Sequence, residues 1–130
     1  MNKASNDDLV KYRLSKSREL LGEIEIHIEH ELWHTAINRL YYACYYAVSA
    51  LLLSKNIKPH THGGVRQMLG LHFIKQGIIS EGLGKFYSDL FDKRQTSDYD
   101  DFVQITKEDV YDMYPNAKEL ITQIEKLLND

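Results

Sequence analysis

The stretch that decides the fold is residues 33–55, WHTAINRLYYACYYAVSALLLSK, which contains neither glycine nor proline. At about 100° per residue, one side of a helix over this stretch carries small and apolar side chains: Ala36, Leu40, Ala43, Ala47, Ala50 and Leu51. The opposite side carries Asn38, Tyr42, Tyr45 and Ser49, with Arg39 and Tyr46 at its flank. Such a helix is usually central. We therefore expect other helices, or a second copy of the chain, to cover both sides, and the alanines to permit a close approach.

The rest of the chain predicts further helices around this one. An apolar stripe runs from Val10 to Ile28, starting after a possible cap near Asn6, and a break is expected at about 29–32. Capping residues Thr61, Ser80 and Thr106 predict three more helix starts, at 62–77, 81–94 and 107–128, with a loop at 97–105 and a kink or boundary at Pro115. His72 falls on the apolar side of the first of these, so we expect it to be half-buried. No strand is indicated, so the fold class is an all-α, four- to five-helix up-and-down bundle.

Length and composition narrow the class of protein. The chain of 130 residues suits one domain, 1–130, and its 16 basic and 19 acidic residues give a net charge of −3. This balance excludes a strongly basic nucleic-acid-binding tail but not a local basic site. No apolar run approaches the roughly 20 residues that span a bilayer, and the first residues lack a signal-peptide pattern. We expect a cytoplasmic protein without a membrane segment.

Residues for metal, cofactor or nucleophile chemistry are sparse. His27, His30 and His34 have metal-ligand spacing on one helix, but the expected break at 29–32 separates them, so no metal site is predicted. The single cysteine, Cys44, lies beside the alanine side and is read as core packing. No phosphate-binding loop, dinucleotide fingerprint or nucleophile elbow occurs, and no cofactor is predicted.

Two groups of residues remain as candidates for binding. Tyr41, Tyr42, Tyr45 and Tyr46 cluster with Arg39, either as a packed aromatic core or as a groove that stacks bases while the arginine holds a phosphate. Spacing alone favours the core. Arg94 and Asp98 form an i,i+4 pair, which spacing alone explains as an ordinary surface pair. His60 and His62 flank Thr61 and could contact a phosphate.

Three segments together resemble a small prokaryotic branch of the HEPN (higher eukaryotes and prokaryotes nucleotide-binding) superfamily. They are NRLYYACYYAVSALLLSKNIKPHTHGGV at 38–65, GLHFIKQG at 70–77 and RQTSDYDDF at 94–102, and the similarity extends from about residue 9 to residue 128. The resemblance implies a dimerising helical bundle with its groove at the dimer interface. It also implies either a metal-independent ribonuclease or one component of a toxin–antitoxin or defence pair with a nucleotidyltransferase.

The catalytic signature of that superfamily is an arginine followed a few residues later by a histidine. Arg94 matches the arginine, but Tyr99 stands where the histidine would be, and no histidine follows His72. A tyrosine titrates near 10 and is a poor base at neutral pH, whereas a histidine titrates near 6.5. The resemblance makes Arg94 and Tyr99 the candidate catalytic pair, in a variant site.

We therefore expect a homodimeric module that binds nucleotide or RNA. The expected protein partner of this module is a nucleotidyltransferase. The expected ligand-binding residues of the module are Arg39, Tyr42, Tyr46, His62, Arg94, Asp98 and Tyr99. The alternatives are a metal-independent ribonuclease toxin that uses Arg94, and a purely structural domain that docks a protein.

Overall fold

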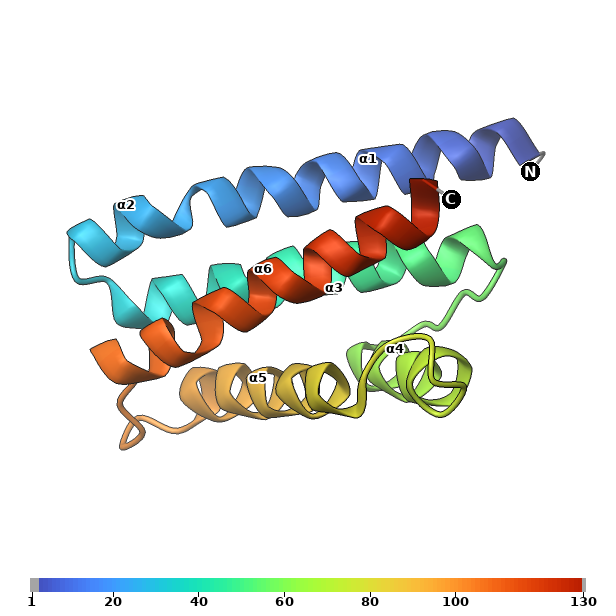
Figure 1. The fold of residues 1–130 in the computed structure, drawn as a ribbon. Helices are drawn as coiled ribbons and strands as arrows, with labels where there is room; N and C mark the ends of the chain where they lie inside the picture. The colour runs from blue at the N-terminus through green and yellow to red at the C-terminus, as the bar shows by residue number, and fades with distance from the viewer. Residues whose placement is uncertain (1–2, 130) are drawn as a thin grey trace.

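The computed structural model describes residues 3–129 and is built of helices packed lengthwise (Figure 1). In chain order its elements are α1 (Lys3–Gly22), α2 (Ile24–Glu29), α3 (Trp33–Ser54), α4 (His62–Leu69), a π-helical turn (Gly70–Ile74), α5 (Glu81–Tyr99) and α6 (Lys107–Asn129). The long helices α1, α3, α5 and α6 alternate in direction, and the short α4 lies across one end (Figure 1). The described residues include no strand. The all-α up-and-down bundle is confirmed.

Helix α3 is the centre of the bundle, as its two-sided pattern predicted. It packs against α1, α2, α4, α5 and α6, and more than half of its residues are buried. The buried apolar side chains of all these helices form one contiguous core cluster. Cys44 belongs to this core and is fully buried, and burial raises the pKa of its thiol far above the usual range.

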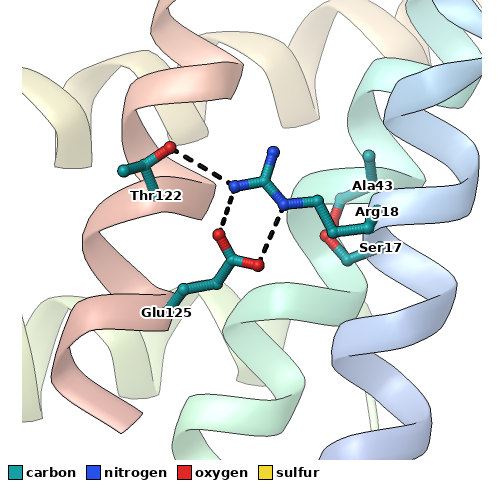
Figure 2. A network of polar contacts seen from close by, with 5 residues as sticks. All are labelled: Ser17, Arg18, Ala43, Thr122 and Glu125. Atoms are coloured by element: carbon teal, nitrogen blue, oxygen red, sulfur yellow. Dashed lines mark hydrogen bonds and ion pairs between the residues drawn. The ribbon is translucent and has the colours of Figure 1, made fainter. Parts of the chain in front are cut away.

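The alanine side of α3 allows a close approach by α1, as expected. The hydroxyl of Ser17 on α1 donates a hydrogen bond of 2.6 Å to the backbone carbonyl of Ala43, and both residues are fully buried (Figure 2). A side chain as short as serine reaches the backbone of a neighbouring helix only where the facing residues are small. The bond also satisfies the one polar atom that α1 buries at this point.

Helix α1 is tied to α6 at the next residue. The guanidinium of Arg18 donates from Nε to Glu125 Oε2 at 2.9 Å and from Nη2 to Glu125 Oε1, and it lies 3.5 Å from Thr122 Oγ1 (Figure 2). This two-pronged pairing matches the flat guanidinium to the flat carboxylate. It fixes the last helix against the first on the exposed side of the bundle.

The caps predicted at Thr61, Ser80 and Thr106 and the break predicted at 29–32 are confirmed. The side chains of Thr61 and Ser80 accept hydrogen bonds from backbone N–H groups in the first turns of α4 and α5. Thr106 and Asp109 cap α6 reciprocally, at 2.8 and 3.2 Å. Between α2 and α3, Glu31 adopts a φ of 57° and reverses the chain without glycine or proline.

Several predicted boundaries were wrong. Helix α1 begins at Lys3, before the cap predicted near Asn6. Helix α5 extends beyond its predicted end at 94 to Tyr99, and so includes the first residues of the loop predicted at 97–105. Helix α6 runs through Pro115, which is therefore not a boundary. The expected helix to Gly77 stops being α-helical at Gly70, where a π-helical turn shifts the register; Phe73 is buried and His72 is exposed instead of half-buried.

None of the helices between Lys3 and Asn129 combines the length and the apolar character that crossing a bilayer would require.

Candidate functional site

The aromatic side of α3 meets α4 and α5 around the ring of Tyr41. This side chain is fully buried, and its ring stacks on Tyr87 of α5 with centroids 6.2 Å apart. The rings of Tyr42 and Tyr45 pack beside it at 5.2 and 5.9 Å. The packed-core alternative is confirmed for Tyr41, whereas Tyr42, Tyr45 and Tyr46 are half-buried at the edge of the core.

Arg94 lies on this aromatic cluster. Its guanidinium carbon is 4.5 Å from the ring centroid of Tyr41 and 5.7 Å from that of Tyr42, within the range of cation–π attraction. The side chain is only 12% exposed, and its Nη1 lies 3.2 Å from Oδ2 of Asp98 one turn along α5. Its Nε is buried and has no hydrogen-bond partner among the described residues. A buried arginine without full pairing is costly, so this one is a candidate for binding an anion.

His62 approaches the same ring from α4. Its Nδ1 lies 2.7 Å from the hydroxyl of Tyr41, and its ring stacks on Tyr45 with centroids 4.3 Å apart. The first turn of α4 sets this position, since Thr61 caps the helix through the N–H of Gly64. A Cβ on Gly64 would lie only 3.0 Å from Thr61 Oγ1 and 3.2 Å from Pro59 Cβ, so a larger residue there would crowd the capping side chain.

Burial shifts the pKa values of Tyr41 and His62 in the directions that favour their neutral forms. Burial raises the pKa of Tyr41 to about 12, although the positive charge of Arg94 opposes part of this rise. Burial, and then the charge of Arg94, lower the pKa of His62 below its usual 6.5. At neutral pH, His62 is therefore an uncharged imidazole and Tyr41 a protonated phenol. One tautomer of His62 donates from Nδ1 to Tyr41 and leaves the lone pair of Nε2 free.

The structure brings together four of the seven predicted ligand-binding residues: Tyr42, His62, Arg94 and Asp98. Arg39 is not in contact with them; among the described residues its polar partners are Asn38, at 2.7 Å, and Glu23, at 3.8 Å. Tyr46 lies one ring further away, edge-on to Tyr45 at 6.0 Å. Tyr99, the other predicted catalytic residue, is 81% exposed at the end of α5.

Three of the aromatic residues packed here, Tyr41, Tyr45 and Tyr87, were not predicted as part of the site. Tyr41 and Tyr45 belong to the tyrosine cluster noted in the sequence but were not assigned to binding, and Tyr87 was not singled out. A signal for Tyr87 was present, because it precedes Arg94 by seven residues, two helical turns, and thus lies on the same side of α5.

His27, His30 and His34, which have metal-ligand spacing in the sequence, lie on different elements. His27 lies on α2 and His34 on α3, with His30 at the turn between them. His30 and His34 are exposed, whereas His27 is half-buried and both of its ring nitrogens lack a hydrogen-bond partner among the described residues. Residues 3–129 hold no group of three potential ligands that could bind a metal ion.

Comparison with known proteins identifies the family. The HEPN domain family matches residues 10–127, nearly the whole chain. The chain belongs to the HEPN family. A protein of Thermotoga maritima named "UPF0332 protein" is 37% identical over 124 residues, which cover 95% of this chain and 94% of the relative.

Two relatives from Methanocaldococcus jannaschii carry a functional name. "Putative toxin MJ0605" is 32% identical and covers 88% of this HEPN chain and 84% of its own length. "Putative toxin MJ0142" is 35% identical, with 74% and 65% covered. The resemblance noted from residues 38–65, 70–77 and 94–102 is thereby confirmed. The strongest candidate site of this HEPN domain is the cluster of Tyr41, Tyr42, His62, Arg94 and Asp98.

Proposed function

We propose that this HEPN protein binds the phosphate of an RNA or nucleotide through Arg94, with Tyr42 providing a surface on which a base stacks. The observation that carries the proposal is the state of Arg94: it is held at 12% exposure against two tyrosine rings with an unpaired Nε. Its one carboxylate partner, Asp98, is 39% exposed, so an incoming phosphate can displace or share it. Base stacking on aromatic rings beside a placed cation is the usual way to bind single-stranded nucleic acid.

The charge of the whole chain is consistent with a localised site. A net charge of −3 provides no general attraction for nucleic acid, so affinity would depend on a few placed cations. The proposal therefore predicts a shallow salt dependence, corresponding to few phosphate contacts.

The biological role we propose is that of a homodimeric toxin paired with a nucleotidyltransferase in a toxin–antitoxin or defence module in the cytoplasm. The names of two relatives from Methanocaldococcus jannaschii, both called putative toxins, support the role of a toxin. The exposed aromatic residues Tyr99 and Phe102, 81% and 96% accessible, support a protein contact at the loop after α5, because large apolar side chains are seldom left so open without a partner.

The test of the binding proposal is fluorescence anisotropy with a short single-stranded RNA at low salt. We expect Arg94→Ala to weaken binding about tenfold or more, since it removes a charge-assisted contact. Arg66→Ala is a matched control: its guanidinium also lies on an aromatic ring, Phe91 at 4.3 Å, and also pairs with a carboxylate, Asp92 at 3.2 Å, but outside the cluster. Equal losses in the two variants, or none in either, would contradict the proposal.

A second candidate function is metal-independent RNA cleavage, and His62 is the observation that favours it. Tyr99, which stands in place of the histidine of the signature, is 81% exposed. His62 and Arg94, by contrast, both contact the side chains of Tyr41 and Tyr42. The neutral Nε2 of His62 would take the proton of a ribose 2′-hydroxyl. The 2′-oxygen would then attack phosphorus, the bond to the 5′-oxygen would break, and that oxygen would take a proton from water.

Cleavage is tested with the same RNA in the presence of a chelator, using His62→Gln as the variant, since glutamine retains a hydrogen bond to Tyr41 but cannot accept a proton. We expect a 2′,3′-cyclic phosphate product from the wild type and a loss of about 100-fold or more in the variant. RNA binding without cleavage by the wild type would refute this second function and leave the first intact. No RNA binding at all, together with a stable protein partner, would instead favour a purely structural docking domain.

A further inference from the structure

The end of α5 and the residues after it, 99–102, display the two most exposed large apolar side chains of the described chain. Phe102 is 96% accessible and Tyr99 81%, whereas all other exposed side chains of this kind are 60% accessible or less. Asp100 and Asp101 stand between the two rings in sequence, and neither forms an ion pair with another described residue. This segment, the aromatic loop, thus combines two exposed rings with uncompensated negative charge.

The aromatic loop is fastened by its own hydrogen bonds. Oδ1 of Asp100 accepts a hydrogen bond from the backbone N–H of Phe102 at 2.9 Å, and the N–H of Asp100 donates to the carbonyl of Thr96, also at 2.9 Å. Ile105 is buried and anchors the chain beyond the loop. Rings on a backbone that is already ordered lose less conformational freedom on association, which favours their use as a docking surface.

A pocket with the opposite charge lies toward the other end of α5. It is formed by α4, the π-helical turn and the first turns of α5, and its volume is about 320 Å³. Pockets of about 300 Å³ and more hold small organic molecules, so this one has room for an aromatic ring. Its base is apolar, because the lining residues Leu69 and Tyr87 are fully buried. Gly70 also lines it, and a Cβ there would meet no other atom within 4 Å.

All charged residues that line this cationic pocket are basic: Arg66, Lys75 and Lys85. Arg66 and Lys85 are each paired with an aspartate of α5, at 3.2 and 2.9 Å. Lys75 is exposed and forms no ion pair within the described part of the chain. An apolar base beside a free ammonium group complements a ring flanked by carboxylates, in both shape of contact and sign of charge.

The aromatic loop cannot reach the cationic pocket of its own chain. The last residue of α5 that lines the pocket is Ser88, and the helix continues to Tyr99 before the chain turns (Figure 1). At 1.5 Å per residue, about 16 Å of helix separates the two. The contact is therefore possible only between two copies of the chain. A contact between two different patches of the same molecule repeats head to tail, and it builds a ring or an open chain of copies.

We propose that the protein assembles head to tail, with Phe102 and Tyr99 of one copy against the cationic pocket of the next and Asp100 and Asp101 facing its Lys75. This assembly differs from a two-fold homodimer, in which a patch meets its own counterpart. The inference goes beyond the proposed function and does not depend on it. The pocket touches the candidate site only through the buried Tyr87, and neither Phe102 nor Lys75 belongs to that site.

The test is light scattering of the full chain, which measures the weight-average mass as the concentration rises from about 10 to about 500 µM, since a contact of this small size is weak. We expect the wild-type mass to rise about twofold or more over this range. Phe102→Ser and Lys75→Glu should each remain at the low-concentration mass. The matched controls are Tyr12→Ser and Lys11→Glu, which make the same changes at exposed positions of α1 and should assemble as the wild type does.

Mixing the two defective variants tests whether the loop meets the pocket. Phe102→Ser retains the pocket and Lys75→Glu retains the loop, so an equimolar mixture should regain a rise in mass that neither variant shows alone. A wild-type mass that does not rise would overturn the proposal and leave the loop to another protein. A normal rise in either variant, a mixture that does not associate, or a loss of assembly in the controls would overturn it too.

The variants also separate this inference from the proposed function. Both altered side chains are exposed, so we expect wild-type melting temperatures for Phe102→Ser and Lys75→Glu. Both variants should bind single-stranded RNA as the wild type does at concentrations below assembly, whereas Arg94→Ala should still assemble. Loss of assembly in Arg94→Ala would overturn the inference, because it would place the contact at the candidate site and not at the pocket.

Discussion

The two sides of α3 are buried by different kinds of side chain. Toward α1, Ala43 and Ala47 leave so little space that a serine hydroxyl bonds directly to the α3 backbone. Toward α4 and α5, Tyr41 and its neighbours fill a wide gap with rings, and the polar atoms there are incompletely paired: the hydroxyl of Tyr87 and Nε of Arg94 have no partner among the described residues. The first side is optimised for packing, whereas the second retains unused bonding capacity, which is what a binding site needs.

The largest expected effect breaks the tight side. Ala43→Trp places a large ring where α1 and α3 touch, and overpacking at a fully buried contact should lower the free energy of unfolding by about 3 kcal/mol or more. Thermal unfolding measures this, with Lys11→Trp, at an exposed position of α1, as the control. An unchanged melting temperature for Ala43→Trp would show that the two helices are not in close contact.

Removing single hydroxyls on the aromatic side should give effects of opposite sign. Tyr41→Phe loses the hydrogen bond to His62 and should destabilise the fold by about 1 kcal/mol. Tyr87→Phe removes a buried hydroxyl that has no partner, so we expect no loss or a gain of up to about 1 kcal/mol. Chemical denaturation of the two variants measures both values. A clear loss in Tyr87→Phe would mean that its hydroxyl is bonded after all.

A smaller effect is expected from the single hydrogen bond on the tight side. Ser17→Ala removes the bond to Ala43 while leaving the shape of the contact, at a cost of about 0.5–1 kcal/mol, since alanine also favours the helix. Denaturant unfolding gives this value. A loss as large as that of Ala43→Trp would show that the bond, and not the small size of the residues, holds the two helices together.

The smallest expected effect is a pH dependence confined to the aromatic side. The pKa of His62 is lowered in the folded state, so between that pKa and 6.5 the unfolded chain binds more protons at this residue than the folded one. Its contribution to stability is therefore complete above pH 6.5 and is lost as the pH falls through the lowered value. Melting temperatures from pH 5 to 7.5 should decline less in His62→Gln than in the wild type. Parallel curves would contradict this assignment.

The sequence predicted which segments are helical better than where the helices end. It also predicted individual site residues better than which of them contact one another. Caps such as Thr61 and Thr106 act within one turn, so their roles could be predicted locally. The extension of α5 to Tyr99 could not be predicted, because residues 95–99 carry no apolar stripe. The loop predicted at 97–105 followed from that missing pattern. The register of the π-helical turn, which buries Phe73 in place of His72, likewise has no signal in a 3.6-residue period.

The candidate site shows the same limit over longer distances. Arg94 was identified from its motif, but its neighbours Tyr41 and His62 are more than 30 residues away in sequence, and only the packing of α4 and α5 on α3 brings them to it. Arg39 was selected because it is close in sequence to the tyrosines, yet it points to Glu23. Spacing along one helix predicts which residues share a face of that helix. It does not predict which face the neighbouring helices cover.

The full burial of Tyr41 has an evolutionary consequence. The same ring lies in the core and under the guanidinium of Arg94, so a substitution there would alter folding and ligand chemistry together. If the proposed site is used for binding, lineages that change its ligand would therefore be expected to vary the more exposed Tyr42 or Asp98, while the ring of Tyr41 stays fixed. A folded variant that lacks only the proposed anion contact is for the same reason best made at Arg94 and not at Tyr41.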